Sequence, residues 1–210
     1  MRAAVAACDG LDGVKDGIIL DPRQCRFDPE ALQCSADAKP GCACLTDAEA
    51  RAIREIWGGP HTAAGERLWF GPEPGASLSA LAGPDAFPIS DWHLRWVRQD
   101  PDADWRALSH AGYEKTFADA RLLFHAAIGT DDPDLSRFRT FGGKLVMWHG
   151  WADELIPPRG TVDYYERVAA RMGGLEEVQR FARLFMAPGV NHCTTGAGPN
   201  VFGQASVRLP

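Results

Sequence analysis

The feature that most constrains the fold is a strand, helix and strand pattern between residues 143 and 189. The run "GKLVMWHG" is short, apolar and ends in a glycine, as a buried strand does, and "FARLFMAPG" is a second such run before a Pro-Gly turn. Between them, "TVDYYERVAARMGG" places Tyr165, Val168 and Met172 on one face of a helix. This order within about 50 residues predicts a parallel α/β unit with a right-handed crossover.

Two residues with catalytic potential follow the expected strands. Asp153 lies just beyond Gly150, and His192 follows the second strand and its turn. Functional residues of open parallel sheets lie beyond the carboxyl ends of strands, and an Asp followed by a His is the order of the last two members of a Ser-Asp-His triad. The carboxylate would orient the imidazole, which takes the serine proton. The alternative is that Asp153 caps its loop and His192 is an ordinary loop histidine; their matching positions favour the triad.

The nucleophile of such a triad is missing from the sequence. An α/β-hydrolase serine lies in a G-x-S-x-G turn after a strand. None of the seven serines has that context, and the nearest match, "GASLS" around Ser77, ends in serine and lies in an irregular region. The serines are at positions 35, 77, 79, 90, 109, 136 and 206.

Composition excludes two classes of partner. The chain has 22 basic and 28 acidic residues, so it carries no basic field that would attract nucleic acid. Its sequence has no apolar run near the roughly 20 residues that a membrane span needs, and we expect no membrane association. The 210 residues, 45% of them hydrophobic, are enough to bury a core.

Five of the six cysteines lie within the first 44 residues, among Asp, Gly and Pro. Zinc sites usually pair their cysteines as C-x2-C, and only "CAC" comes close to that spacing here. Disulfides are therefore favoured over a metal-thiolate site, which predicts an oxidising compartment, either secreted or periplasmic.

The segment before the α/β unit is less regular. Residues 1–7 predict a short helical end, and "LTDAEARAIREIWGGP" predicts a helix with a capping box formed by Thr46 and Glu49. Residues 60–110 are rich in Gly, Pro and aromatic side chains without a long period, which is typical of a lid or insertion. Tryptophans 57, 69, 92, 96 and 105 could line a pocket for an aromatic acid, although aromatic residues more often pack in a core.

The stretch "DGLDGVKDGI" combines three aspartates with three glycines. Asp9, Asp12 and Asp16 offer the hard oxygen ligands that calcium prefers, but their spacing is not that of an EF-hand. The alternative is a solvated turn built from Asp-Gly pairs.

Several motifs in the same order resemble the tannase and feruloyl esterase family of serine esterases. They are "CDGLDGVKDGIILDPRQCRFDPEALQC", "CLTDAEA", "GGKLVMWHGWADELIPP", "DYYERV" and "LFMAPGVNHC". The resemblance is dense over residues 8–60 and 132–195 and thin over 85–130. It implies that Asp153 is the triad acid and His192 the triad base, while His149 of the "HG" pair is interpreted as structural.

The resemblance also implies a metal site and a set of disulfides. Calcium would bind the side chains of Asp9, Asp12 and Asp16 and the backbone carbonyls of Val14 and Ile18. The implied disulfides are Cys8 to Cys25 and Cys34 to Cys44, with Cys42 left as an extra thiol. In the family, the cysteine beside the histidine is bonded to a cysteine directly before the nucleophilic serine; Cys193 matches this cysteine and would be unpaired in this chain.

These inferences combine into one prediction. Residues 1–130 are expected to be mostly a calcium-binding lid, with 1–7 the end of a hydrolase helix, and 131–210 to be the C-terminal part of an α/β-hydrolase sheet. The resemblance implies a chain that is a fragment of an esterase for aromatic, phenolic acid esters, inactive alone and prone to aggregate through an open sheet edge. The alternative is a non-catalytic, calcium-stabilised module that binds a ligand.

Overall fold

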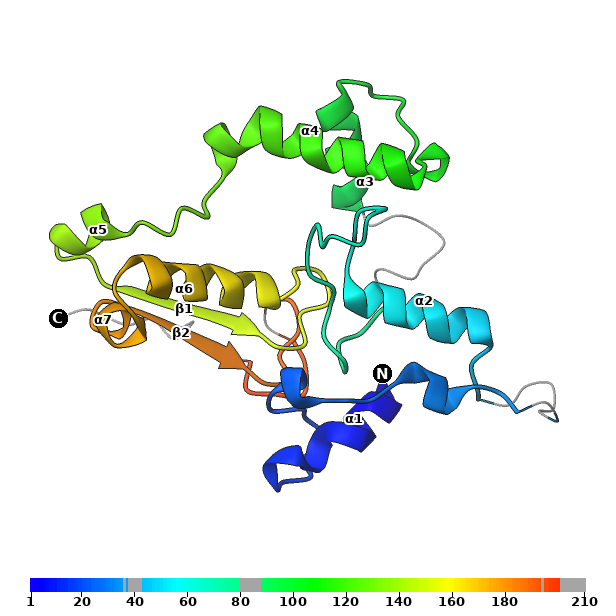
Figure 1. Cartoon of the computed structure of the whole chain (residues 1–210). Helices are drawn as coiled ribbons and strands as arrows, with labels where there is room; N and C mark the ends of the chain where they lie inside the picture. Colours follow the sequence, from blue (N-terminus) through cyan, green and yellow to red (C-terminus); the bar gives the residue numbers. More distant parts are fainter. Residues whose placement is uncertain (36, 38–42, 80–87, 194, 201–210) are drawn as a thin grey trace.

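A computed structural model describes residues 1–35, 37, 43–79, 88–193 and 195–200. Its α-helices and strands are coloured along the chain in Figure 1. In chain order they are α1 (Arg2–Cys8), α2 (Asp47–Gly58), α3 (Pro88–Arg98), α4 (His110–Ile128), α5 (Ser136–Thr140), β1 (Leu145–Gly150), α6 (Arg159–Arg171), α7 (Leu175–Gln179) and β2 (Ala182–Ala187).

The α/β unit predicted from residues 143–189 is present. Strands β1 and β2 pair in parallel, in a register that runs from Leu145 opposite Ala182 to Gly150 opposite Ala187. Helix α6 connects them, and the short helix α7, which the sequence pattern did not reveal, precedes β2. The chain is therefore an α/β protein in this region.

One face of the two-stranded sheet forms the main apolar core. Tyr165 and Val168 of α6 are buried with Val178 and Phe181, and Met172 packs against the same cluster, as the helical periodicity predicted. Side chains that alternate with the inward-facing ones are exposed instead: Val146, Trp148 and Phe185. The sheet therefore has one covered face and one exposed apolar face in the described part of the chain.

The N-terminal segment is built from short turns rather than long elements. After α1, three 3₁₀ turns follow at Asp9–Asp12, Pro22–Gln24 and Pro29–Leu32. The disulfide between Cys8 and Cys25 packs against Ile19 in a small apolar cluster. This segment buries little apolar surface around each turn, so covalent links replace part of a core.

Helix α2 begins where its sequence predicts. The Thr46 hydroxyl accepts a hydrogen bond from the Glu49 backbone N–H, and Glu49 in turn accepts one from the Thr46 N–H, which is a complete capping box. The helix ends at Gly58 and is followed by Gly59, whose φ of 78° lies in the left-handed region favoured by glycine.

The expectation that residues 60–110 are irregular is wrong for Pro88–Arg98, which form α3. Leu94 and Val97 of this helix are buried while Trp92 and Trp96 are exposed, so large apolar side chains on the exposed side hid its period. Trp96 stacks on Phe124 of the long helix α4, with ring centroids 3.9 Å apart. Helices α3 and α4 lie together on the opposite side of the molecule from α1 (Figure 1).

Contacts also join the N-terminal half to the α/β unit. Glu73 is almost fully buried, and its carboxylate accepts hydrogen bonds from Nε and Nη2 of Arg159, at the start of α6. Gly160 leaves room for the ring of Trp69, since a Cβ there would lie 2.6 Å from it. An ion pair and a close aromatic contact therefore fix segment 69–73 against α6.

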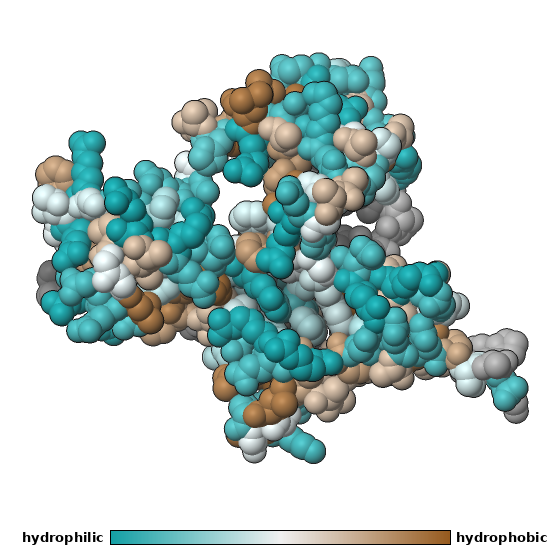
Figure 2. Space-filling model, in the orientation of Figure 1, coloured by the Kyte–Doolittle hydropathy of each residue, from teal (hydrophilic) through white to brown (hydrophobic). Residues whose placement is uncertain are grey.

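The face of the molecule drawn in Figure 2 is mostly polar with scattered apolar groups. Apolar side chains are exposed on α4, among them Leu122, Leu123 and Ile128. Within the described residues, no helix combines the length and apolar character that crossing a membrane requires.

Candidate active site

The loops that follow β1 and β2 lie against each other. The backbone N–H of Trp151 donates to the carbonyl of Ala187, and that of Ala152 donates to the carbonyl of Val190. A side chain at Gly150 would place its Cβ 2.2 Å from the Val190 oxygen, so only glycine permits this approach. The register of the sheet thus carries both loops to one edge, as expected for the carboxyl ends of parallel strands.

Asp153 lies in the first of these loops and is buried, with 4% of its surface exposed. Its Oδ1 accepts hydrogen bonds from the backbone N–H groups of Leu155, at 2.9 Å, and Ile156, at 2.8 Å. Its Oδ2 lies 3.1 Å from Nε2 of His149. The carboxylate is therefore held by its own loop and by the strand before it.

The ionised form of Asp153 is strongly favoured. Burial alone would raise its pKa, but hydrogen bonds from the His149 ring, the backbone of Ile156 and Leu155 and the His192 ring lower the pKa to about 2. Asp153 is a carboxylate across the physiological pH range, so it accepts hydrogen bonds and cannot donate one.

His192 lies in the second loop, after the Pro188-Gly189 turn. Its ring nitrogen Nδ1 is 3.2 Å from Oδ1 and 3.1 Å from Oδ2 of Asp153. The structure therefore brings together the two residues that the sequence predicted as a pair. Because the carboxylate only accepts, Nδ1 carries the proton, and Nε2 is the nitrogen that can act as a base in the neutral ring.

Glu154 is a further site residue that the sequence analysis did not identify. Its Oε2 accepts a hydrogen bond from the His192 backbone N–H at 3.2 Å. In the sequence, only its position directly after Asp153 indicates that Glu154 belongs to the site. The contact itself spans 38 residues and depends on how the two loops meet. The histidine is thus fixed at its backbone by Glu154 and at its ring by Asp153.

No serine completes a triad in the part of the chain that the structure describes. Ser109 caps α4, and Ser136 donates its hydroxyl to the sulfur of Met172. Ser77 and Ser79 are bonded to each other. The described residues thus place a carboxylate beside a histidine with no serine hydrogen-bonded to that histidine, and the sequence has no G-x-S-x-G motif.

The three aspartates of the predicted calcium loop take part in local backbone bonds. Asp9 Oδ1 accepts from the N–H groups of Asp16, Gly17 and Ile18, and Asp12 accepts from Val14. Their oxygen chemistry suits calcium, but across the described ranges no three acidic, histidine or cysteine side chains are gathered as metal ligands. The structure does not assemble the full ligand set, and calcium binding stays a prediction.

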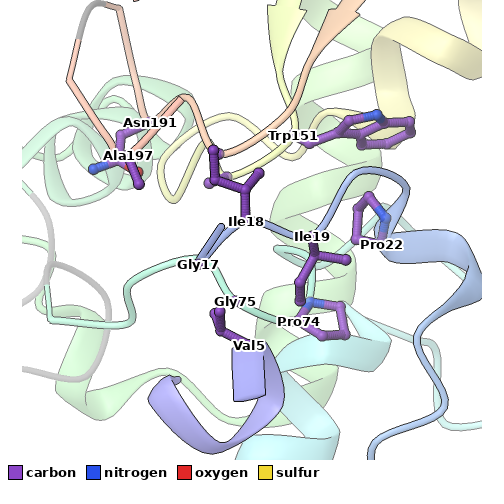
Figure 3. A pocket seen from close by; sticks show the side chains of 12 residues that line it. Val5, Gly17, Ile18, Ile19, Pro22, Pro74, Gly75, Trp151, Asn191 and Ala197 are labelled. Carbon is purple, nitrogen blue, oxygen red and sulfur yellow. The ribbon is translucent and has the colours of Figure 1, made fainter. Parts of the chain in front are cut away.

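This aspartate loop contacts the histidine loop directly. A Cβ on Gly189 would lie 3.0 Å from the side chain of Ile18, and both residues line a small cavity of about 100 Å³. Figure 3 shows Ile18 and Ile19 in this cavity together with Trp151 and Asn191. The position of the aspartate loop can therefore affect the loop that carries His192.

The disulfides implied by the resemblance are formed. Cys8 is bonded to Cys25 and Cys34 to Cys44, which confirms both pairs. Cys193 is free and exposed, so its thiol is open to a partner. Cys42, predicted as an extra thiol, lies outside the described residues.

The five tryptophans do not converge on one site. Trp57 packs edge-on against Phe27, and Trp69 packs against Phe70. Trp92 is largely exposed, Trp96 stacks on helix α4, and Trp105 lines a cavity of about 730 Å³ between α3 and α4. The volume at Trp105 is within the range of small-molecule sites.

A parallel β-α-β unit that presents a buried Asp and a His at its strand ends is typical of α/β-hydrolases. The chain belongs to the tannase and feruloyl esterase family, which it matches over residues 1–109 and 97–207. It is 37% identical to a probable feruloyl esterase from Arthroderma benhamiae over 93% of this chain and 38% of the relative. It is also 33% identical to an uncharacterized esterase from Xanthomonas campestris, over 96% of this chain and 40% of that protein.

A solved structure supports the same assignment. The crystal structure of feruloyl esterase B from Aspergillus oryzae is similar with a TM-score of 0.83 and 29% identity, over 97% of this chain and 42% of that one. The chain thus spans about two fifths of the length of the relatives that it matches.

Proposed function

We propose that this chain supplies the acid, the base and the lid of a carboxylic ester hydrolase that acts on esters of aromatic, phenolic acids such as feruloyl or galloyl esters. The observation that carries the proposal is the contact between His192 Nδ1 and the buried carboxylate of Asp153, at 3.1 Å, in a chain of this family. The serine would come from a segment outside these 210 residues.

The chemistry follows from the protonation of the pair. Nε2 of His192 accepts the proton of the serine hydroxyl as the serine oxygen attacks the ester carbonyl, and Asp153 stabilises the resulting imidazolium. The imidazolium then returns the proton to the departing alcohol, which leaves an acyl-serine. A water molecule, deprotonated by His192, releases the aromatic acid and restores the serine.

The test is reconstitution with an upstream family segment that carries a G-x-S-x-G motif. The 210 residues alone should not hydrolyse a methyl ester of a hydroxycinnamic acid, and the extended protein should. In the extended protein, Asp153→Asn should lower kcat by roughly 10⁴-fold and His192→Ala by roughly 10⁶-fold, as for other serine triads. His125→Gln removes a second histidine bonded to an aspartate, His125 to Asp131 at 2.7 Å, and is the matched control.

Two results would refute the proposal. One is ester hydrolysis by the 210 residues alone at a rate that His192→Ala leaves unchanged. The other is a folded extended protein with its serine in place and no hydrolysis of any aromatic ester offered.

We further propose that the aspartate loop binds one calcium ion through Asp9, Asp12 and Asp16 and the carbonyls of Val14 and Ile18. Three carboxylates in eight residues repel one another, and a cation would relieve that repulsion. Calorimetric titration of the chain should show one calcium site. Asp12→Ala should remove this site, and Asp102→Ala, which changes an aspartate of another loop, should retain it. Absence of binding at millimolar calcium would rule out the site.

The two disulfides support a secreted or periplasmic location for the protein. Expression with export to an oxidising compartment should give a chain in which both bonds are present by peptide mapping without reduction. Equal yield and stability from a reducing cytoplasm, with both pairs as thiols, would count against this location.

One observation favours a second function, that of a non-catalytic ligand-binding module. The cavity of about 730 Å³ between α3 and α4 is lined by Leu94, Val97, Trp105 and Phe117, and its size suits a small aromatic ligand. This function would be supported if the chain binds a hydroxycinnamic acid, if Trp105→Ala weakens that binding, and if Asp153→Asn leaves it unchanged. No binding to the folded chain would exclude it.

A further inference from the structure

His149 connects the helix that follows the active-site loop to the carboxylate of Asp153. It is the penultimate residue of β1, and only 12% of its side chain is exposed. Nδ1 of its ring lies 2.7 Å from the Thr161 hydroxyl in α6. Nε2 lies 3.1 Å from Asp153 Oδ2 and 3.1 Å from the Ile156 carbonyl oxygen.

These partners determine which ring nitrogen carries the proton. The Ile156 carbonyl and the ionised Asp153 carboxylate can only accept hydrogen bonds, so Nε2 of His149 is the donor. The hydroxyl of Thr161 can then donate to Nδ1 of the neutral ring. The environment therefore selects the Nε2–H tautomer of His149 and holds the ring from both sides.

The consequence is a fixed carboxylate plane. Backbone N–H groups of Leu155 and Ile156 hold Oδ1 of Asp153, and His149 holds Oδ2. Without His149, Oδ2 would retain only its contact with His192, and the carboxylate could rotate about its Cβ–Cγ bond. The contacts of His192 Nδ1 with both oxygens of Asp153 depend on this orientation of the carboxylate plane.

We propose that His149 is a positioning residue: it sets the Asp153 carboxylate in the orientation that holds His192 in its productive tautomer. This deepens the proposed esterase function and rests on it for its catalytic meaning. Thr161 supports the same chain of contacts by fixing the His149 ring. The arrangement resembles the outer contacts that orient ligating or catalytic groups in other sites, whose loss typically costs roughly 10–100-fold.

The first experiment is NMR spectroscopy of the 210-residue chain, with no ester present. Nitrogen shifts should show His149 protonated at Nε2 and His192 protonated at Nδ1. In His149→Phe, the pKa of Asp153 should rise from about 2, because a donor to the carboxylate is lost, and the Nδ1–H resonance of His192 should broaden or disappear. His149→Gln, whose amide can reach as Nε2 does, should restore both signals.

Thr161 gives a second pair of variants in case His149→Phe does not fold. Thr161→Val keeps the shape but removes the hydroxyl, so His149 should lose its single tautomer; Thr161→Ser should retain it. His125→Gln, remote along the chain, should leave the Asp153 and His192 signals unchanged. In the extended esterase, His149→Phe should lower kcat roughly 10–100-fold with little change in KM, and His149→Gln should recover most of it.

The outcomes separate this inference from the esterase proposal. An unchanged Asp153 pKa and an unchanged His192 resonance in folded His149→Phe would overturn the positioning role, even if Asp153→Asn and His192→Ala abolish hydrolysis. If the NMR signals shift as expected but the extended protein hydrolyses no ester, the contacts stand and the esterase function fails.

Discussion

The β1–α6–β2 unit and the cysteine-rich segment 8–45 maintain their structures in different ways. The first is held by an apolar cluster that includes Tyr165, Val168 and Phe181. The second uses three short 3₁₀ turns and two disulfides around a much smaller cluster. Non-local packing dominates in one region, and covalent closure of short loops in the other.

Both regions contact the candidate active site. Asp153 and His192 extend from the packed unit, while Ile18 of the cysteine-rich segment lies against Gly189 of the histidine loop. The site thus depends on a rigid sheet for the pair itself and on a crosslinked loop for one wall of its surroundings. Changes in the two regions should therefore affect the site to different degrees.

The largest effect is expected from Phe181→Ala, in the core of the packed unit. Phe181 is 6% exposed and packs with Val178 and Ala182, and removing a buried aromatic ring costs about 3–5 kcal/mol. Denaturant unfolding should show this loss, and hydrogen exchange should locate it in β1, α6 and β2 while residues 8–25 keep their protection. Phe141→Ala, an exposed phenylalanine of the same region, is the control.

Equal loss of protection in both regions would show that they unfold as one unit. In that case the contrast between packing and crosslinking describes the native contacts but not the unfolding behaviour.

The next effect is expected from removal of the disulfide between Cys8 and Cys25. Their separation of 17 residues gives a loop whose closure contributes about 3 kcal/mol by restricting the unfolded chain. The variant with both cysteines changed to serine should lose exchange protection around Ile19 first. Cys193→Ser, which changes a free and exposed thiol, is the matched control.

A double-serine variant that loses protection in β1 and β2 as much as around Ile19 would contradict the local role of this disulfide. Local loss accompanied by a change in the His192 resonances would instead show that contact through Ile18 transmits the effect to the site.

The sequence was most informative where local patterns decide the structure. Short apolar runs before turns predicted β1 and β2, helical periodicity predicted α6, and the capping box predicted the start of α2. The rule for parallel strand ends placed Asp153 near His192, and the structure joins them. The pairing of the N-terminal cysteines came from the family resemblance, because spacing alone leaves several connectivities open.

Other features depend on contacts that no local pattern encodes. Helix α3 was missed because Trp92 and Trp96 lie on its exposed side and disguise its period. Glu154 contacts the backbone of His192, which is distant in sequence, and Thr161 contacts His149 from another element. Their roles become visible only once the loops after β1 and β2 are placed together.

The smallest of the three effects concerns Asp153, where the packed unit meets the site. Its folded pKa of about 2 lies below the ordinary 3.8, so folding favours the ionised carboxylate. That contribution, about 2 kcal/mol, is present above pH 4 and is lost as the pH falls from about 4 to 2. Asp153→Asn should therefore destabilise the chain at pH 7, with a difference from wild type that shrinks toward pH 2.

Unfolding by denaturant at pH 7, 4, 3 and 2 measures that difference directly. The asparagine also turns an N–H toward Nε2 of His149 or toward the backbone donors, so a pH-independent part of the loss should remain at pH 2. A difference that stays constant from pH 7 to 2 would mean that Asp153 ionises alike in the folded and unfolded chain. The hydrogen bonds from His149, Leu155 and Ile156 would then position the carboxylate without stabilising its charge.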